Sequence, residues 1–151
     1  MNEEFNSDKF IVFKVANHLL ALPIHQVIKV VNRSEIKINK FTTMGLIQIG
    51  RHMIKLLDLH QQLNTESLSH ASNPQSFLVI TYDAQRELCG VLVDEPPDLM
   101  ELPPEIVQPL PKSDNYSKFA IEMVSHVAVL TQKNLTQTIF LLNFQHTTVI
   151  S

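Results

Sequence analysis

The sequence predicts an all-β protein, and two observations support that fold class. Short runs of β-branched and aromatic residues recur along the chain with turn residues between them, a pattern typical of strands joined as hairpins. Only one brief helix is expected, over residues 25–31, where the spacing is that of an amphipathic helix. Strands this short avoid exposed edges most readily when their sheets close into barrels. With 151 residues, the chain can form one domain, or two very small barrels that share a core.

The first predicted hairpin joins residues 10–15 to residues 19–24 through a turn at 16–18. The segment that follows places Val27, Val30 and Val31 at i, i+3 and i+4, a spacing typical of about two turns of helix. Its β-branched content keeps a strand as the alternative. Residues 32–44 are polar and are expected to form a loop.

The second predicted hairpin is interrupted by a glycine. Apolar alternation runs through Ile47 and Ile49, loses phase at Gly50 and resumes as an apolar run from Met53. A tight turn or a bulge produces such a break, because glycine adopts a positive φ without steric cost. We therefore expect strands at 46–49 and 53–57 with a turn at 50–52, although residues 53–63 also fit a helical spacing.

The second half of the chain continues this hairpin pattern. After a polar surface connection at 64–76, residues 77–82 and 87–93 form the clearest hairpin, around a turn at 83–86. Six of the eight prolines lie between residues 96 and 111, and because proline has no N–H for a ladder we expect only short edge strands and turns there. Residues 119–130 and 138–144 form the last hairpin, with a loop at 131–137 and one face made of Phe119, Ile121, Met123, Val127 and Val129.

Composition excludes several classes of function. The net charge of −3 argues against a nucleic-acid-binding surface, which needs a dense patch of lysine and arginine. Residues 1–8 are polar and acidic, so we expect a flexible tail and no signal peptide. No apolar run approaches the ~20 residues needed to cross a bilayer, and the single cysteine, Cys89, is expected to be a buried strand residue. The sequence therefore predicts a soluble cytoplasmic protein with no direct membrane insertion.

Nothing in the sequence predicts catalysis, a cofactor or a metal site. The three glycines form neither of the phosphate-binding patterns, and no G-x-S-x-G occurs. The seven histidines show no H-x-H or H-E-x-x-H spacing, which leaves Asp58 and His60, the only close carboxylate–histidine pair, as a weak enzyme hypothesis. Charge is instead segregated: residues 29–40 carry a net +3 and residues 94–105 a net −5, an asymmetry that can steer complementary partners.

Several blocks of the sequence resemble a CheW-like domain, in the family's order and at its spacings. The blocks are FIVFKVANHLLALPIHQVIKVV, GLIQIGRHMIKLLDL, FLVITYDAQRELCGVLVDEPPDLMEL, and IVQPLP followed by TIFLLNFQ. The resemblance covers residues 9–146 as a single domain. It implies an all-β fold of two intertwined five-stranded SH3-like β-barrel subdomains that share a core, with short helical segments.

The resemblance also implies a function without catalysis. It suggests an adaptor that couples the tips of methyl-accepting chemoreceptors to a CheA-like histidine kinase, recruited to receptor arrays at the membrane. By analogy, Ile24, Val27 and Val30 would offer an apolar edge to the kinase's CheW-like regulatory domain or to the receptor, while a receptor-facing turn would comprise Gly45, Gln48, Gly50 and Arg51. The alternative is a stand-alone β-barrel module that binds a small ligand or a peptide, which would need a concave apolar pocket between the two halves.

Three features depart from the family's pattern. The family's N-L-R-G turn appears here as Gln48-Ile49-Gly50-Arg51, with the arginine and the glycine exchanged. Lys29 falls where many members carry an acid, and Lys55 falls where proline is usual. These departures indicate a divergent adaptor that serves a specialised pathway, such as pilus-based or light-directed movement.

Overall fold

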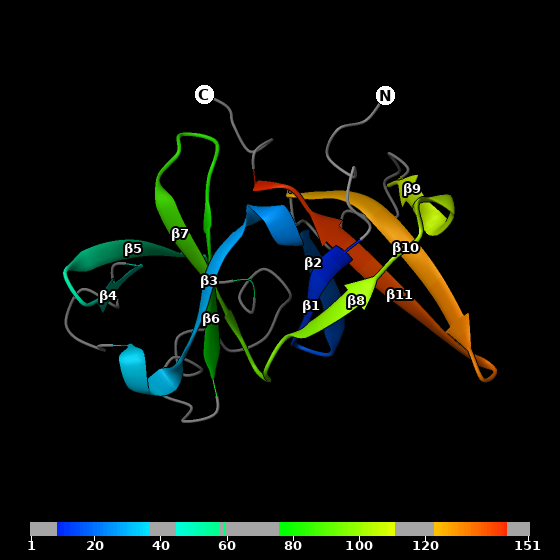
Figure 1. Cartoon of the computed structure of the whole chain (residues 1–151), viewed down its shortest axis with the longest axis horizontal. Helices are drawn as coiled ribbons and strands as arrows, with labels where there is room; N and C mark the ends of the chain where they lie inside the picture. Colours follow the sequence, from blue (N-terminus) through cyan, green and yellow to red (C-terminus); the bar gives the residue numbers. More distant parts are fainter. Residues whose placement is uncertain (1–8, 37–44, 58, 60–75, 111–122, 145–151) are drawn as a thin grey trace.

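The computed structural model describes residues 9–36, 45–57, 59, 76–110 and 123–144 (Figure 1). Within these ranges the chain forms two β-sheets and three short 3-10 turns. The tail predicted at 1–8 lies outside the described residues, as do most of the connection predicted at 64–76 and the first part of the strand predicted at 119–130.

The first sheet has six strands. They are β1 (Lys9–Val15), β2 (His18–Pro23), β8 (Asp98–Glu101), β9 (Val107–Pro109), β10 (Val124–Gln132) and β11 (Leu135–Leu142), in the order β8-β1-β2-β11-β10-β9. Neighbours are antiparallel, except that β2 and β11 run parallel. The 3-10 turn η6 (Pro104–Ile106) connects β8 to β9. The proline-rich segment thus contributes two short edge strands and a turn, as its composition predicts.

The second sheet has five strands. They are β3 (Val27–Asn32), β4 (Leu46–Ile49), β5 (His52–Leu57), β6 (Phe77–Tyr82) and β7 (Leu88–Val93), in the order β3-β6-β7-β5-β4. The pairing of β5 with β7 is parallel and the other pairings are antiparallel. Two 3-10 turns flank β3, namely η2 (Ile24–Gln26) and η3 (Arg33–Glu35).

Tight turns with left-handed residues connect the hairpins. Ala16 and Asn17 have φ of 52° and 70°, and Lys133 and Asn134 have φ of 51° and 65°. Two consecutive positive φ values are typical of the type I′ turn, whose twist matches that of the flanking strands. The β4–β5 turn differs, because only Gly50, with φ of 58°, is in this region.

Each sheet wraps around its own apolar cluster, and a third cluster lies between the sheets. All strands of the five-stranded sheet contribute to one cluster, which includes Val31, Ile47, Ile54, Leu78 and Leu92. All strands of the six-stranded sheet contribute to another, which includes Phe10, Ala21, Ala128, Ile139 and the partly buried Met100 and Val107. The third cluster combines Phe13, Leu20 and Leu142 of one sheet with Val79, Val91 and Val93 of the other. A sheet whose every strand reaches one cluster must be strongly curved, so the fold is two small barrels with a shared core.

The prediction of a helix over residues 25–31 is wrong, and its strand alternative is confirmed. The chain makes the single turn η2 and then enters β3, which pairs with β6 from Val27↔Thr81 to Asn32↔Phe77. Neighbouring β-branched residues favour strand because their side chains lose rotamer freedom in a helix. Similarly, the helical alternative for residues 53–63 fails at its start, because β5 extends to Leu57 between β4 and β7.

The predicted face of the last hairpin is also wrong in part. Met123 and Ala128 are buried, whereas Val129 is 42% exposed. A register shift between Val124 and His126 moves the alternation by one residue, so the small Ala128 faces the core in place of Val127 and Val129. The loop predicted at 131–137 shrinks to a two-residue turn, because Gln132 and Leu135 still pair across the hairpin.

Candidate functional site

The seven predicted partner-binding residues fall into two sets at opposite edges of the five-stranded sheet. The edge set comprises Ile24, Val27 and Val30, on η2 and β3. The hairpin set comprises Gly45, Gln48, Gly50 and Arg51, on and around β4 and its turn into β5. Because the sheet order is β3-β6-β7-β5-β4, strands β6, β7 and β5 separate β3 from β4. The two sets therefore form two surfaces.

In the edge set, only part of the predicted apolar surface is available. Val27 is partly buried and packs against the shared core, and Ile24 is also partly buried. Val30 is 36% exposed, and Ile28, which sequence reasoning did not select, is 46% exposed. Ile28 lies at a register shift, where Val27 pairs with Thr81 but Lys29 pairs with Ile80. A bulge of this kind turns an extra side chain out of the ladder, and nothing in the local sequence signals it.

Polar contacts lie at both ends of this edge strand. The Thr81 hydroxyl donates to the carbonyl of Gln26 at 2.6 Å, which ties η2 to β6. At the other end, the Asn32 side chain accepts the backbone N–H of Ser34 at 3.0 Å and caps η3. The exposed Ile28 and Val30 are therefore presented on a strand that Thr81 ties at its start and that pairs with β6 along its length.

In the hairpin set, backbone geometry explains both glycines. Gly45 has φ of 85°, and its carbonyl accepts the N–H of Leu56 at 2.7 Å. Gly50 begins the turn at φ of 58°, and its carbonyl accepts Nε2 of Gln48 at 3.1 Å. Arg51 follows with its side chain exposed. The phase break in the sequence therefore marks a real turn, and Arg51 lies at its outermost point.

The register of this hairpin separates a core face from an outer face. Ile47 pairs with Ile54, and both are buried in the cluster of the five-stranded sheet. The alternate pairs, Leu46↔Lys55 and Gln48↔Met53, must point to the opposite side. Met53 is 43% exposed there. Met53 and Lys55 thus belong to the same outer face as Gln48, although sequence reasoning did not propose them.

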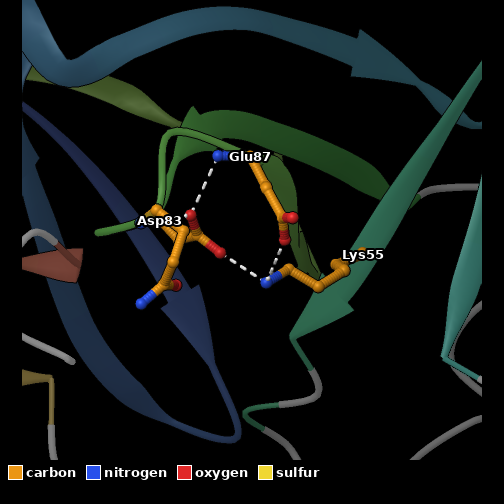
Figure 2. Close-up of polar contacts among 4 residues, drawn as sticks. Lys55, Asp83 and Glu87 are labelled. Carbon is orange, nitrogen blue, oxygen red and sulfur yellow. Dashed lines mark hydrogen bonds and ion pairs between the residues drawn. The ribbon is translucent and has the colours of Figure 1, made fainter. Parts of the chain in front are cut away.

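Lys55 connects this outer face to the neighbouring β6–β7 turn (Figure 2). Its ammonium group forms a short ion pair with Oδ2 of Asp83 and a second contact, of 3.2 Å, with Oε1 of Glu87. The other carboxylate oxygen of Asp83 accepts the backbone N–H groups of Gln85 and Glu87, each at 2.9 Å. The Asp83 side chain is only 10% exposed, so these contacts compensate for the burial of its charge.

The electrostatics of this network favour the charged forms of both partners. The hydrogen bond to Asp83 raises the pKa of Lys55 above its usual value, against the smaller effect of burial. Burial acts to raise the pKa of Asp83, but the hydrogen bond from Lys55 and those from the backbone of Glu87 and Gln85 together lower it. The pair is therefore ionised at neutral pH.

The adjacent cysteine is buried, and its surroundings disfavour the thiolate form. Cys89 is fully buried, on β7 opposite Lys55. Burial, with a contribution from the charge of Asp83, raises the pKa of its thiol to about 12. The thiol is therefore protonated at neutral pH, and the prediction that Cys89 is a buried strand residue is confirmed.

A separate groove lies on the six-stranded side of the molecule. Its volume is about 760 Å³. The lining comes from the β1–β2 hairpin, the segment leading into β8, and β11, and includes Val12, Lys14, His18, Asp98, Met100 and Phe140. The groove therefore does not lie between the two sheets, where the ligand-binding alternative would place a pocket.

The described residues contain no cluster of three or more histidine, cysteine or carboxylate side chains that could hold a metal ion. Asp58 and His60, the pair behind the enzyme hypothesis, lie outside the described residues. Over the part of the chain that is described, no helix is long and apolar enough to cross a membrane.

Comparisons with known proteins agree with this geometry. A structural match is the scaffolding protein TtCheW from Thermoanaerobacter tengcongensis, with 20% identity, a TM-score of 0.67 and coverage of 93% of each chain. This match confirms the predicted fold of two SH3-like barrels, one of which is formed here by six strands. No curated protein matches the sequence. The family model described as "CheW-like domain" matches residues 9–145, and the chain therefore belongs to the CheW-like family.

Proposed function

We propose that this chain is a non-enzymatic adaptor that couples the cytoplasmic tips of chemoreceptors to a CheA-like histidine kinase. Membership of the CheW-like family over residues 9–145 is the observation that carries the proposal. An adaptor needs at least two binding surfaces, and the edge and hairpin sets supply two that are separated by three strands. Recruitment to membrane receptor arrays would then follow from receptor binding.

The edge set suits the CheW-like regulatory domain of the kinase. Ile28 and Val30 expose aliphatic side chains on an edge strand, which can add to another β-sheet or pack against its apolar surface. Apolar burial contributes about 25 cal/mol per Å² before the cost of association is subtracted. Two aliphatic side chains therefore support a modest and reversible contact, which an array can strengthen by repetition.

The hairpin set suits the receptor tip. Arg51, an exposed residue, supplies a guanidinium group at the turn, on the same hairpin as Gln48 and the exposed Met53. An arginine can bind a carboxylate through two parallel hydrogen bonds, and methionine adapts to irregular apolar surfaces. We assign this surface to a helical receptor tip that presents acidic and apolar side chains.

The experiment is a capture of the kinase and the receptor from the native cell by the purified full chain. Val30→Asp is the edge variant, because Val27 packs on the core and its replacement would unfold the chain. We expect Val30→Asp to weaken kinase capture, and Arg51→Asp to weaken receptor capture, each by about tenfold or more. The identity of the captured partners would also show whether the pathway drives flagella, pili or another output.

Each variant has a matched control on the six-stranded sheet. Val129 is an exposed valine comparable to Val30, and Lys133 is a cation at a hairpin turn, comparable to Arg51. Val129→Asp and Lys133→Asp should leave both captures unchanged. If Val30→Asp and Arg51→Asp remain folded and also bind both partners normally, the two surfaces are wrongly assigned.

A second candidate function is supported by the groove on the six-stranded side, which is large enough for a small ligand or a short peptide. Thr138 lines this groove, and Thr138→Arg would fill part of it. If Thr138→Arg abolished partner capture while the edge and hairpin variants did not, the groove would be the functional site and the module would be a ligand or peptide receptor.

A further inference from the structure

The β4–β5 hairpin is attached to the rest of its sheet over a short stretch. β4 is the terminal strand of the sheet, and within the described residues β5 pairs with β7 only at Lys55, Leu56 and Leu57. The remainder of the hairpin, with the turn that bears Gly50 and Arg51, lies beyond that paired stretch, at the left of the molecule in Figure 1. The orientation of this turn therefore depends on what fixes the hairpin where it leaves β7.

Lys55 occupies the point where the hairpin separates from β7. It is the paired residue nearest to the turn, and its side chain lies on the outer face with Gln48 and Met53. Its ammonium group reaches Asp83 and Glu87, which flank the β6–β7 turn. Lys55 thus connects the base of the hairpin to a second point on the sheet, through a side chain and not through the backbone ladder (Figure 2).

The acceptor of this contact is rigid. Asp83 and Glu87 are joined by the bond from the Asp83 N–H to the Glu87 carbonyl, and the N–H of Arg86 donates to the Asp83 carbonyl, both at 2.9 Å. Two further backbone N–H groups hold Oδ1 of Asp83, which leaves Oδ2 directed at Lys55. A fixed acceptor can restrain a mobile donor, whereas two flexible side chains restrain each other weakly.

We propose that Lys55 is a positioning residue, which holds the β4–β5 hairpin and its Arg51 turn in the orientation that binds the receptor, by an ion pair with Asp83. The proposal rests on the proposed function for its receptor arm. Its structural arm is independent, because it concerns the motion of the hairpin in the free protein. Glu87 has a lesser role, since its side chain is 65% exposed and its contact with Lys55 is screened by water.

The test measures amide hydrogen exchange of the full chain by NMR, in the wild type and in four variants. Lys55→Met keeps the length and packing of the side chain but removes the charge, and Asp83→Asn keeps an acceptor for the turn but removes the ion pair. Both should accelerate exchange of the ladder amides of Ile47, Ile54 and Leu56 by roughly three- to tenfold, because these N–H groups lie at the hydrogen-bonded pairs of the hairpin, while amides of the distant β1–β2 hairpin stay unchanged. Lys55→Arg should restore slow exchange, and Glu87→Gln should change it less than about twofold.

Salt provides a readout that a purely packing role would not change. Raising sodium chloride from about 0.05 to about 0.5 M should accelerate exchange of the hairpin amides in the wild type, and should have no such effect in Lys55→Met, which has no ion pair to screen. If the hairpin amides exchange equally in wild type and Lys55→Met, or if Lys55→Arg fails to restore the wild-type rate, the positioning role is wrong.

Receptor capture separates this inference from the proposed function. Under the proposal, Lys55→Met and Asp83→Asn weaken receptor capture, and kinase capture is retained. If the hairpin amides accelerate but receptor capture is unchanged, Lys55 restrains the hairpin without serving binding, and the positioning role is overturned. If the folded wild type captures no receptor, the proposed function fails. The exchange experiment still decides whether Lys55 fixes the hairpin.

Discussion

Lys55 and Asp83, 28 positions apart in the sequence, form an ion pair that joins β5 to the turn between β6 and β7. Asp83 is one of the few buried polar residues in the described part of the chain. Its carboxylate is satisfied by one ammonium group and two backbone N–H groups, so it fixes the turn and the strand that packs beside it. The parallel strands β5 and β7 are not connected by a short loop. They are linked at one end through Lys55 of β5 and the turn that leads into β7.

The first prediction concerns the pH dependence of this pair. The pKa of Asp83 is lowered from its ordinary value of 3.8, so its contribution to stability is complete above that value and is lost as pH falls through the lower folded-state pKa. Lys55 has the opposite sign: its contribution is complete below 10.5 and is lost only as pH rises through its raised pKa. Asp83→Asn should therefore reduce the free energy of unfolding by about 1 kcal/mol at neutral pH.

Urea denaturation between about pH 2.5 and pH 8 measures this difference. The stability gap between wild type and Asp83→Asn should be constant in the neutral range and should narrow in acid below the ordinary carboxyl pKa of 3.8. Glu87→Gln is the control, and its effect should be small because the side chain is largely exposed. A gap as wide in strong acid as at neutral pH would mean that the ionisation of Asp83 does not contribute.

The second prediction concerns the thiol. Cys89 is the single cysteine of the chain, it is fully buried, and its pKa is raised to about 12. A thiol reagent should therefore react with the native protein only through opening of the structure, at a rate at least about a hundredfold below that of a free cysteine. The same reagent in denaturant should react at the free rate. Fast reaction of the native chain would show that the thiol is accessible.

The strand pattern of the fold could be predicted from the sequence where a single period held. The hairpin at 77–82 and 88–93 alternates or remains apolar throughout, and both strands were located within a residue of their observed ends. The pattern failed where the ladder is irregular. The register shifts at Val27–Lys29 and Val124–His126 each move the buried face by one residue, and such shifts depend on the partner strand.

The same reason limits prediction of the candidate site. Gly50 could be found because a phase break in the alternation marks a turn, whereas Ile28 could not, because its exposure depends on a bulge against β6. The contact of Lys55 with Asp83 depends on the parallel pairing of β5 with β7, which brings together segments from different hairpins. The sequence indicated only that Lys55 stands where the family usually has proline.

The third prediction concerns packing at Gly90 on β7. A Cβ atom at this position would lie 2.9 Å from the side chain of Leu78, which is fully buried in the five-stranded sheet's cluster. Gly90→Ala should therefore destabilise the chain by about 1–3 kcal/mol through overpacking. The double variant Gly90→Ala with Leu78→Val tests the cause, because the smaller side chain relieves the contact. In thermal unfolding, the double variant should lose less stability than the sum of the losses of the two single variants. If the losses simply add, the contact with Leu78 is not the cause.

The last prediction concerns the exchanged order of glycine and arginine at the β4–β5 turn. Gly50 has φ of 58°, and a Cβ atom there would meet nothing within 4 Å, so any penalty for a side chain is conformational and not steric. An L-residue in the left-handed region costs about 1–2 kcal/mol. Gly50→Ala should therefore lower the free energy of unfolding by about that amount, whereas Arg51→Ala, in the same turn but at a residue without positive φ, should change it by less than about 0.5 kcal/mol.

Restoring the family's order, by Gly50→Arg together with Arg51→Gly, moves a long side chain into the strained position and should destabilise the chain at least as much as Gly50→Ala. Chemical denaturation of the three variants measures these differences. A swapped chain as stable as the wild type would show that the turn can shift its glycine by one residue, and that the order of the pair then serves only to direct the guanidinium group.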